Sequence, residues 1–134
     1  MKTLVVPMGG KSSRFPNMRP KWMLTHPKKN KFMVTEAISG LNLDFFDRVS
    51  FVVLKEHEDQ YQFTKGLIRE LEEIGIADKS TITYLPEQTS SQSETVYKVI
   101  KEVGIEGFIF IKDSDNYYEC EITEPINQVA YFDL

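Results

Sequence analysis

Residues 3–16 read Thr3-Leu4-Val5-Val6-Pro7-Met8-Gly9-Gly10-Lys11-Ser12-Ser13-Arg14-Phe15-Pro16. The first four are apolar or β-branched, which predicts a short buried strand that ends at Pro7. Residues 8–20 are rich in Gly, Ser, Pro and basic side chains, which is typical of a loop. The chain therefore opens with a strand that leads directly into a basic loop.

Apolar and polar segments go on alternating along the rest of the chain. Apolar residues at helical spacing predict helices at residues 33–41, 57–74 and 92–103. Short runs of apolar and β-branched residues predict a buried strand at residues 49–54, a third strand at 81–85, a fourth, apolar strand at 108–111 and a final strand-like stretch at 129–132. The order of the first seven elements is β-α-β-α-β-α-β.

The helix ends have recognisable signals. The helix at residues 57–74 is predicted from one apolar stripe, formed by Tyr61, Leu67, Ile68, Leu71 and Ile74. Gly75 is expected to end this helix. Ser91 is expected to cap the next helix, with Glu94 three residues later as the second half of a capping box.

Strands that alternate with helices predict an α/β fold with a parallel sheet covered by helices on both faces. In such sheets, ligands bind outside the carboxyl ends of the strands, where the strand order reverses. Two loops with unusual chemistry leave strand ends, at residues 8–20 and 112–119. We therefore expect them to form one site within a single domain, residues 1–134.

Composition excludes several classes of protein. Hydrophobic residues make up 41% and charged residues 27% of the 134 residues, which is ordinary for a soluble globular domain. The apolar runs are far shorter than the roughly 20 residues of a membrane span. Leu4-Val5-Val6 is too short for a signal peptide, and the single Cys120 excludes an internal disulfide. These features favour a cytoplasmic protein without a membrane partner.

Charge is concentrated at one end of the sequence. Residues 1–31 contain eight basic residues and no acid, whereas the whole chain has a net charge of −4. An acidic protein with one intensely basic segment is typical of a local anion site. A general nucleic-acid binder is expected to be basic overall, so no nucleic-acid partner is predicted.

The basic loop does not match the two best-known phosphate motifs. Gly10-Lys11-Ser12 resembles the end of a P-loop, but Val5 stands where that motif requires Gly, and the dinucleotide motif G-x-G-x-x-G is also absent. Adjacent glycines still allow backbone N–H groups to form an anion nest, and the forked guanidinium of Arg14 suits phosphate. Lys21 adds a point charge. The alternative is a connection whose glycines serve only for turning.

The acidic loop follows the strand at 108–111 and begins Lys112-Asp113-Ser114-Asp115-Asn116. Two carboxylates one residue apart at the end of a buried strand are costly to pack without a cation. Their hard oxygen ligands suit Mg²⁺ or Mn²⁺. The alternative is an ordinary Asp/Asn turn.

A family resemblance rests on these motifs. Gly10-x-Ser12-Ser13-Arg14-Phe15, followed by Pro20-Lys21-x-Met23-Leu24, resembles the signature of nucleotidyltransferases that make nucleotide-activated sugars. Among them are the sugar-1-phosphate nucleotidylyltransferases of capsular and other envelope polysaccharide pathways. Ser12 stands where this family usually has its second Gly. Asp115-Asn116 matches the family's metal-binding position, so the resemblance ranks Asp115 above Asp113 as a metal ligand.

The resemblance implies a three-layer Rossmann-like fold, of the type also found in GT-A glycosyltransferases. It extends over the whole chain, but the chain corresponds to about the first half of the family's domain. The implied domain is therefore the nucleotide-binding portion, truncated relative to the full family domain. The half that usually supplies most of the acceptor pocket has no counterpart here, so another chain completing the site is one open alternative.

The resemblance also implies a reaction. A phosphorylated sugar or alcohol attacks the α-phosphate of a nucleoside triphosphate, and pyrophosphate leaves. Arg14 and Lys21 are the implied catalytic residues, and Asp115 and Asp113 the implied Mg²⁺ or Mn²⁺ ligands. The implied nucleotide-binding residues are Met8, Gly9, Gly10, Lys11, Ser12, Ser13, Arg14, Gln88 and Ser91.

Alternatives in other classes stay open. A non-catalytic nucleotide-binding fragment is expected to bind the triphosphate without turnover. A glycosyltransferase of the same fold is favoured by the D-x-D spacing of Asp113 and Asp115, and disfavoured by a basic loop that suits a triphosphate. The base, the acceptor and the oligomeric state, including a homo-oligomer, are left open by the sequence.

Overall fold

The computed structural model describes residues 1–8, 23, 31–89, 91–114, 119–122 and 124. Four strands form one parallel sheet in the order β3-β2-β1-β4. They are β1 (Lys2–Met8), β2 (Arg48–Leu54), β3 (Ser80–Leu85) and β4 (Phe108–Ile111). The predicted strand at 129–132 lies outside the described residues.

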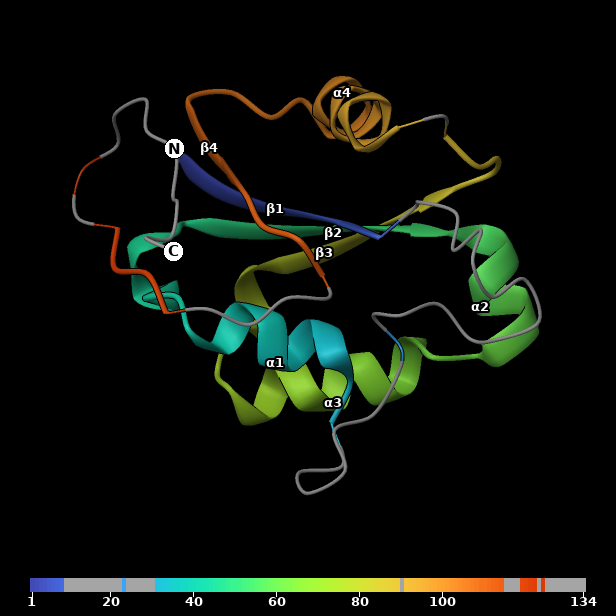
Figure 1. The fold of residues 1–134 in the computed structure, drawn as a ribbon, viewed down its shortest axis with the longest axis horizontal. Coiled ribbons are helices and arrows are strands. Elements are labelled where there is room, and N and C mark those ends of the chain that lie inside the picture. Colours follow the sequence, from blue (N-terminus) through green and yellow to red (C-terminus); the bar gives the residue numbers. More distant parts are fainter. Residues whose placement is uncertain (9–22, 24–30, 90, 115–118, 123, 125–134) are drawn as a thin grey trace, which may run out of the picture.

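Helices cover both faces of the sheet (Figure 1). The α-helices are α1 (Met33–Ser39), α2 (Lys55–Tyr61), α3 (Thr64–Glu73) and α4 (Gln92–Val103). Two short 3₁₀ helices are η2 (Leu43–Phe45) and η3 (Ala77–Lys79). Figure 1 shows α4 on one face and α1 with α3 on the other, which confirms the predicted three-layer α/β architecture.

Each face of the sheet has its own core, because successive residues of a strand point to opposite sides. On one face, Leu4 packs in a cluster with Ile38 of α1 and Leu67 of α3. On the other face, Val5 packs in a cluster with Val99 of α4. The described residues include no helix long and apolar enough to cross a membrane.

β1 continues through Pro7 to Met8, so the prediction that Pro7 ends the strand is wrong. Pro7 pairs with Val52 of β2. On the opposite side of β1, the backbone N–H of Lys112 donates to the Val5 carbonyl at 3.0 Å. Backbone N–H groups alternate between the two sides of a strand, so the Pro7 nitrogen faces the β4 side, as the Val5 carbonyl does. The pairing of β1 with β4 ends at Val5 opposite Ile111, so no residue of β4 lies opposite Pro7. The missing N–H of Pro7 therefore costs no hydrogen bond between strands.

The single helix predicted at residues 57–74 is two helices. Gln62 adopts a left-handed conformation (φ 50°, ψ 54°), which ends α2. The Glu58 carboxylate accepts hydrogen bonds from the Thr64 backbone N–H (3.0 Å) and hydroxyl (2.7 Å), so it satisfies a free donor at the start of α3. The break follows from this local capping.

The buried stripe of α3 also differs from the prediction. Phe63, Leu67 and Leu71 are buried at i, i+4 and i+8, whereas Ile68 is 40% exposed. Phe63 lies just before α3 and packs into the core shared with α1. The buried face of α3 therefore starts at Phe63 and leaves Ile68 at the surface.

The predicted ends of α3 and α4 are confirmed. Gly75 follows α3 with φ 80°, a left-handed conformation that suits glycine. The Ser91 hydroxyl accepts the Glu94 backbone N–H at 3.2 Å and so caps α4. β4 differs from its predicted burial: it lies at the edge of the described sheet, and Ile111 is 48% exposed.

Candidate functional site

The carboxyl ends of β1 and β4 lie side by side, because these strands pair in parallel with Val5 opposite Ile111. The chain passes from β1 outward through β2 to β3. The helix α4 then connects β3 to β4, which lies on the other side of β1. The strand order therefore reverses between β1 and β4. This is the position at which open α/β sheets bind ligands.

Both loops singled out in the sequence start at this position. The basic loop leaves β1 after Met8, and the acidic loop leaves β4 after Ile111. Most of the predicted site residues lie outside the described residues, namely Gly9, Gly10, Lys11, Ser12, Ser13, Arg14, Lys21 and Asp115. The described ones are Met8, Gln88, Ser91 and Asp113.

Met8 is the last residue of β1 and is only 2% exposed. Its side chain belongs to the core on the α1 and α3 face, and it pairs with Val53 of β2. A ligand at the carboxyl edge is therefore expected to meet the backbone of Met8 and not its side chain.

Gln88 and Ser91 precede α4. Gln88 is exposed, and the Ser91 hydroxyl is engaged as the helix cap. Two buried threonines fix this segment: Thr89 and Thr95 share a hydrogen bond between their hydroxyls, and the Thr95 hydroxyl also donates to the Ser91 carbonyl at 3.2 Å. The start of α4 is therefore held by Thr89, which precedes the Ser91 cap, and by Thr95, which follows it.

Asp113 lies two residues beyond the end of β4 and is held at two atoms. Its carboxylate Oδ1 accepts a hydrogen bond from Gln92 Nε2 at 2.9 Å. Its backbone carbonyl accepts one from Lys112 Nζ at 3.0 Å. The contact with Gln92 brings the first residue of α4 to the acidic loop, and it was not predicted from the sequence.

Lys112 is fully buried, with 0% of its surface exposed. A buried ammonium group is costly unless it is paired and hydrogen-bonded. Its position directly after β4 places this charge at the point where the strand order reverses. In the sequence, Lys112 stands out only as a member of the acidic loop, and nothing in the sequence around it indicates that a lysine is buried here.

Asp113 offers carboxylate oxygens, the type of ligand that Mg²⁺ and Mn²⁺ prefer. The described residues contain no group of three or more His, Cys, Asp or Glu side chains that would hold a metal by themselves. Mg²⁺ at phosphate-transfer sites is usually held by one or two carboxylates together with substrate phosphates. The exposed and oriented carboxylate of Asp113 meets that requirement.

His57 lies in α2, which starts directly at the carboxyl end of β2. The side chain is half-buried beside Tyr61, with 6.4 Å between the ring centroids. Desolvation lowers the pKa of His57 below its ordinary value of 6.5, and the nearby Glu56 carboxylate opposes this. Among the described residues, its buried Nδ1 has no hydrogen-bond partner.

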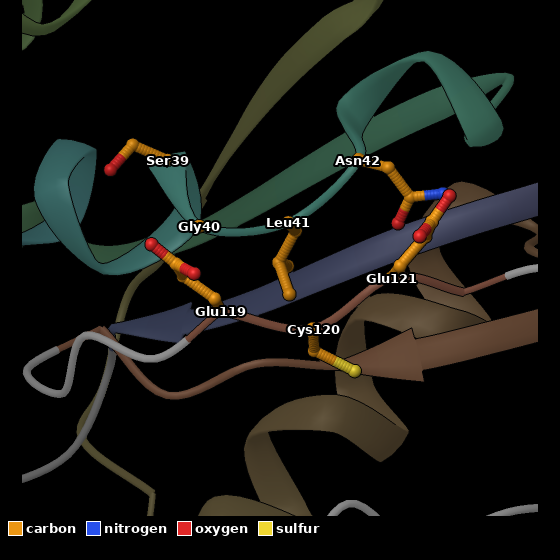
Figure 2. Close-up of a pocket in the computed structure, with 7 residues that line it drawn as sticks. All are labelled: Ser39, Gly40, Leu41, Asn42, Glu119, Cys120 and Glu121. Atoms are coloured by element: carbon orange, nitrogen blue, oxygen red, sulfur yellow. The ribbon is translucent and has the colours of Figure 1, made fainter.

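A pocket lies between the segment that follows α1 and residues 119–121 (Figure 2). It has a volume of about 450 Å³ and is lined by Ser39, Gly40, Leu41, Asn42, Glu119, Cys120 and Glu121. Residues 40–42 follow α1 and lead toward the start of β2, so this pocket belongs to the amino-terminal side of the sheet. It is therefore separate from the candidate site.

Comparison with known proteins supports the fold. No family model and no curated protein matches the chain. A matching solved structure is the nucleoside-diphosphate-sugar pyrophosphorylase from Vibrio cholerae RC9, with 22% identity and a TM-score of 0.62 over 87% of this chain and 48% of that chain. The chain thus shares the α/β fold of that neighbour and spans about half its length.

Proposed function

We propose that this chain is the nucleotide-binding domain of a sugar-phosphate nucleotidyltransferase. In the proposed reaction, a phosphate oxygen of a sugar phosphate, or of another phosphate monoester, forms a bond to the α-phosphorus of a nucleoside triphosphate. The bond between the α-phosphorus and the bridging oxygen breaks, and pyrophosphate leaves. The product is a nucleotide-activated sugar or alcohol, with cell-surface polysaccharide synthesis as its proposed use.

The observation that supports this proposal most directly is the pairing of β1 with β4. Their neighbouring carboxyl ends are the starting points of a loop with basic residues and of a loop with Asp113 and Asp115. Basic residues suit the triphosphate, and the carboxylates would suit a divalent metal ion that accompanies it. The fold shared with the pyrophosphorylase from Vibrio cholerae supports the same class of reaction.

The proposed roles follow from charge and position. The backbone N–H groups of residues 9–13 and the guanidinium of Arg14 bind the β- and γ-phosphates. Lys21 stabilises the charge that develops at the α-phosphate. Such a site works by positioning its substrates and by neutralising charge, without a covalent intermediate on the protein.

Asp115 and Asp113 are the proposed ligands of Mg²⁺ or Mn²⁺. When bound, such a cation neutralises phosphate charge and fixes the phosphate oxygens. Within the chain itself, Gln92 and Lys112 hold Asp113 in place by the two hydrogen bonds described above.

Thermal unfolding with the four common nucleoside triphosphates, each with and without Mg²⁺, tests the nucleotide site. Binding to the folded state at 100 times the Kd stabilises a protein by about 2.7 kcal/mol, so the expected result is a Mg²⁺-dependent rise in Tm. A nucleoside without phosphates serves as the control. Equal Tm values with and without each triphosphate would contradict the proposal.

A second candidate function is nucleotide binding without turnover. The pairing of β1 with β4 supports it as well, because a site that binds a triphosphate at this edge does not by itself require turnover. Pyrophosphate release, measured with a panel of sugar phosphates and alcohol phosphates, separates the two. Binding with pyrophosphate release supports the transferase, whereas binding without release supports the binding domain.

A further inference from the structure

Gln92 and Asp113 are separated by 21 residues in the sequence but share a hydrogen bond of 2.9 Å. Gln92 is the first residue of α4, and Asp113 follows β4. The contact therefore links the segment that precedes α4 to the acidic loop. Neither the apolar pattern nor the motifs of the sequence required it.

Hydrogen bonds hold the backbone around Gln92 and around Asp113 in place. At the helix end, the Ser91 hydroxyl caps α4, and the buried hydroxyls of Thr89 and Thr95 bond to each other. At the strand end, Lys112 donates from its backbone to β1 and from its Nζ to the Asp113 carbonyl, both at 3.0 Å. A side chain held by rigid neighbours keeps a defined geometry, as a binding site requires.

The residue type also fits this task. The amide of glutamine donates a hydrogen bond without bringing a charge of its own, so it does not replace a cation as the partner of the carboxylate. A lysine at residue 92 would neutralise Asp113, and a glutamate would repel it. Gln92 donates to Oδ1, and within the described part of the chain no hydrogen bond reaches Oδ2, so Oδ2 is the proposed metal-binding atom.

We infer that Gln92 is a positioning residue, which holds Asp113 in the orientation that binds a divalent cation at the proposed nucleotide site. This inference rests on the proposed function. Partners that orient a metal ligand typically change metal affinity by roughly 10- to 100-fold when they are removed. Gln92→Leu is therefore expected to weaken Mn²⁺ binding by about 10-fold.

The experiment measures Mn²⁺ binding to the full chain by electron paramagnetic resonance, with and without a nucleoside triphosphate. Gln92→Leu is compared with Gln60→Leu, the same substitution at an exposed position of α2. Gln60→Leu is expected to bind Mn²⁺ as the wild type does. Circular dichroism and urea unfolding check that the variants keep the fold.

A double-mutant cycle with Asp113→Asn separates positioning from a general structural effect. If Gln92 acts through Asp113, adding Gln92→Leu to Asp113→Asn changes the Mn²⁺ affinity no further, because coupled residues are not additive. Additive losses, or a Gln92→Leu variant with wild-type affinity, would overturn the inference and leave the proposed function standing. A wild-type chain that binds neither Mn²⁺ nor any triphosphate would overturn both.

Discussion

Asn42 and Ile122 lie 80 residues apart in the sequence and exchange two hydrogen bonds. The Asn42 side-chain amide donates to the Ile122 carbonyl at 2.6 Å, and its Oδ1 accepts the Ile122 backbone N–H at 2.8 Å. Beside them, the Cys120 backbone N–H donates to the Gly40 carbonyl at 3.1 Å. Residues 120–122 are thereby held against the segment that follows α1.

Asn42→Ala is expected to destabilise the fold by about 1–2 kcal/mol, because two part-buried backbone groups of Ile122 lose their partner. Urea unfolding checks this value. Ser39→Ala is the control, since it removes one exposed hydrogen bond and is expected to cost less than about 0.5 kcal/mol. Equal unfolding midpoints for the two variants would contradict the bracing role of Asn42.

Gly107→Ala is expected to be more destabilising than Gly75→Ala. Both glycines have positive φ, at 90° and 80°, so alanine costs roughly 1–2 kcal/mol at either position. At Gly107 a Cβ would also lie 2.5 Å from the Met1 carbonyl oxygen, whereas at Gly75 it would meet nothing within 4 Å. Such overpacking adds about 1–3 kcal/mol to the destabilisation. Equal urea midpoints for the two variants would contradict this prediction, because they would show that Met1 moves away from the new Cβ without cost.

The lowered pKa of His57 predicts that stability falls as the solution becomes acidic. The unfolded chain binds a proton near pH 6.5, while burial disfavours the charged imidazole in the folded state. The contribution of His57 to the free energy of unfolding is therefore complete above pH 6.5. It is lost as the pH falls from 6.5 toward the lowered pKa of His57 in the folded state. Urea unfolding between pH 7.5 and 5.5 is expected to show a flatter pH dependence for His57→Gln than for the wild type.

Arg14→Ala and Lys21→Ala are expected to affect different steps of the proposed reaction. Loss of the Arg14 fork removes binding of the triphosphate, so the KM for the triphosphate is expected to rise by roughly 10-fold or more. Loss of Lys21 removes a charge that acts mainly in the transition state, so kcat is expected to fall by roughly 100-fold. Steady-state pyrophosphate release measures both.

Lys101→Ala, an exposed cation on α4, is the control for these two variants and is expected to keep both constants. A Lys21→Ala variant with wild-type kcat would contradict the role given to Lys21. Unchanged KM in Arg14→Ala would contradict the binding role of the basic loop.

Much of the fold was predictable because its signals are local. The strand at residues 81–85 ends before Pro86, and the Ser91 cap and the Gly75 turn depend only on neighbouring residues. The break between α2 and α3 was not predictable from the apolar stripe. It depends on the left-handed Gln62 and on Glu58, which caps the start of α3.

The candidate site divides in the same way. Basic and acidic residues in two loops after apolar strands are visible in the sequence, so an anion site and a metal site were both predictable. The hydrogen bond from Gln92 to Asp113 and the burial of Lys112 were not, because each depends on how α4 and β4 pack.

The sequence by itself determined the alternation of strands and helices, since hydrophobic period and turn chemistry act over a few residues. Only the tertiary structure decided that β4 pairs with β1 and not with β3. That choice depends on the crossover of α4 over one face of the sheet, where Val99 packs in one cluster with Val5. Contacts of this kind join residues far apart in the chain, and no local pattern encodes them.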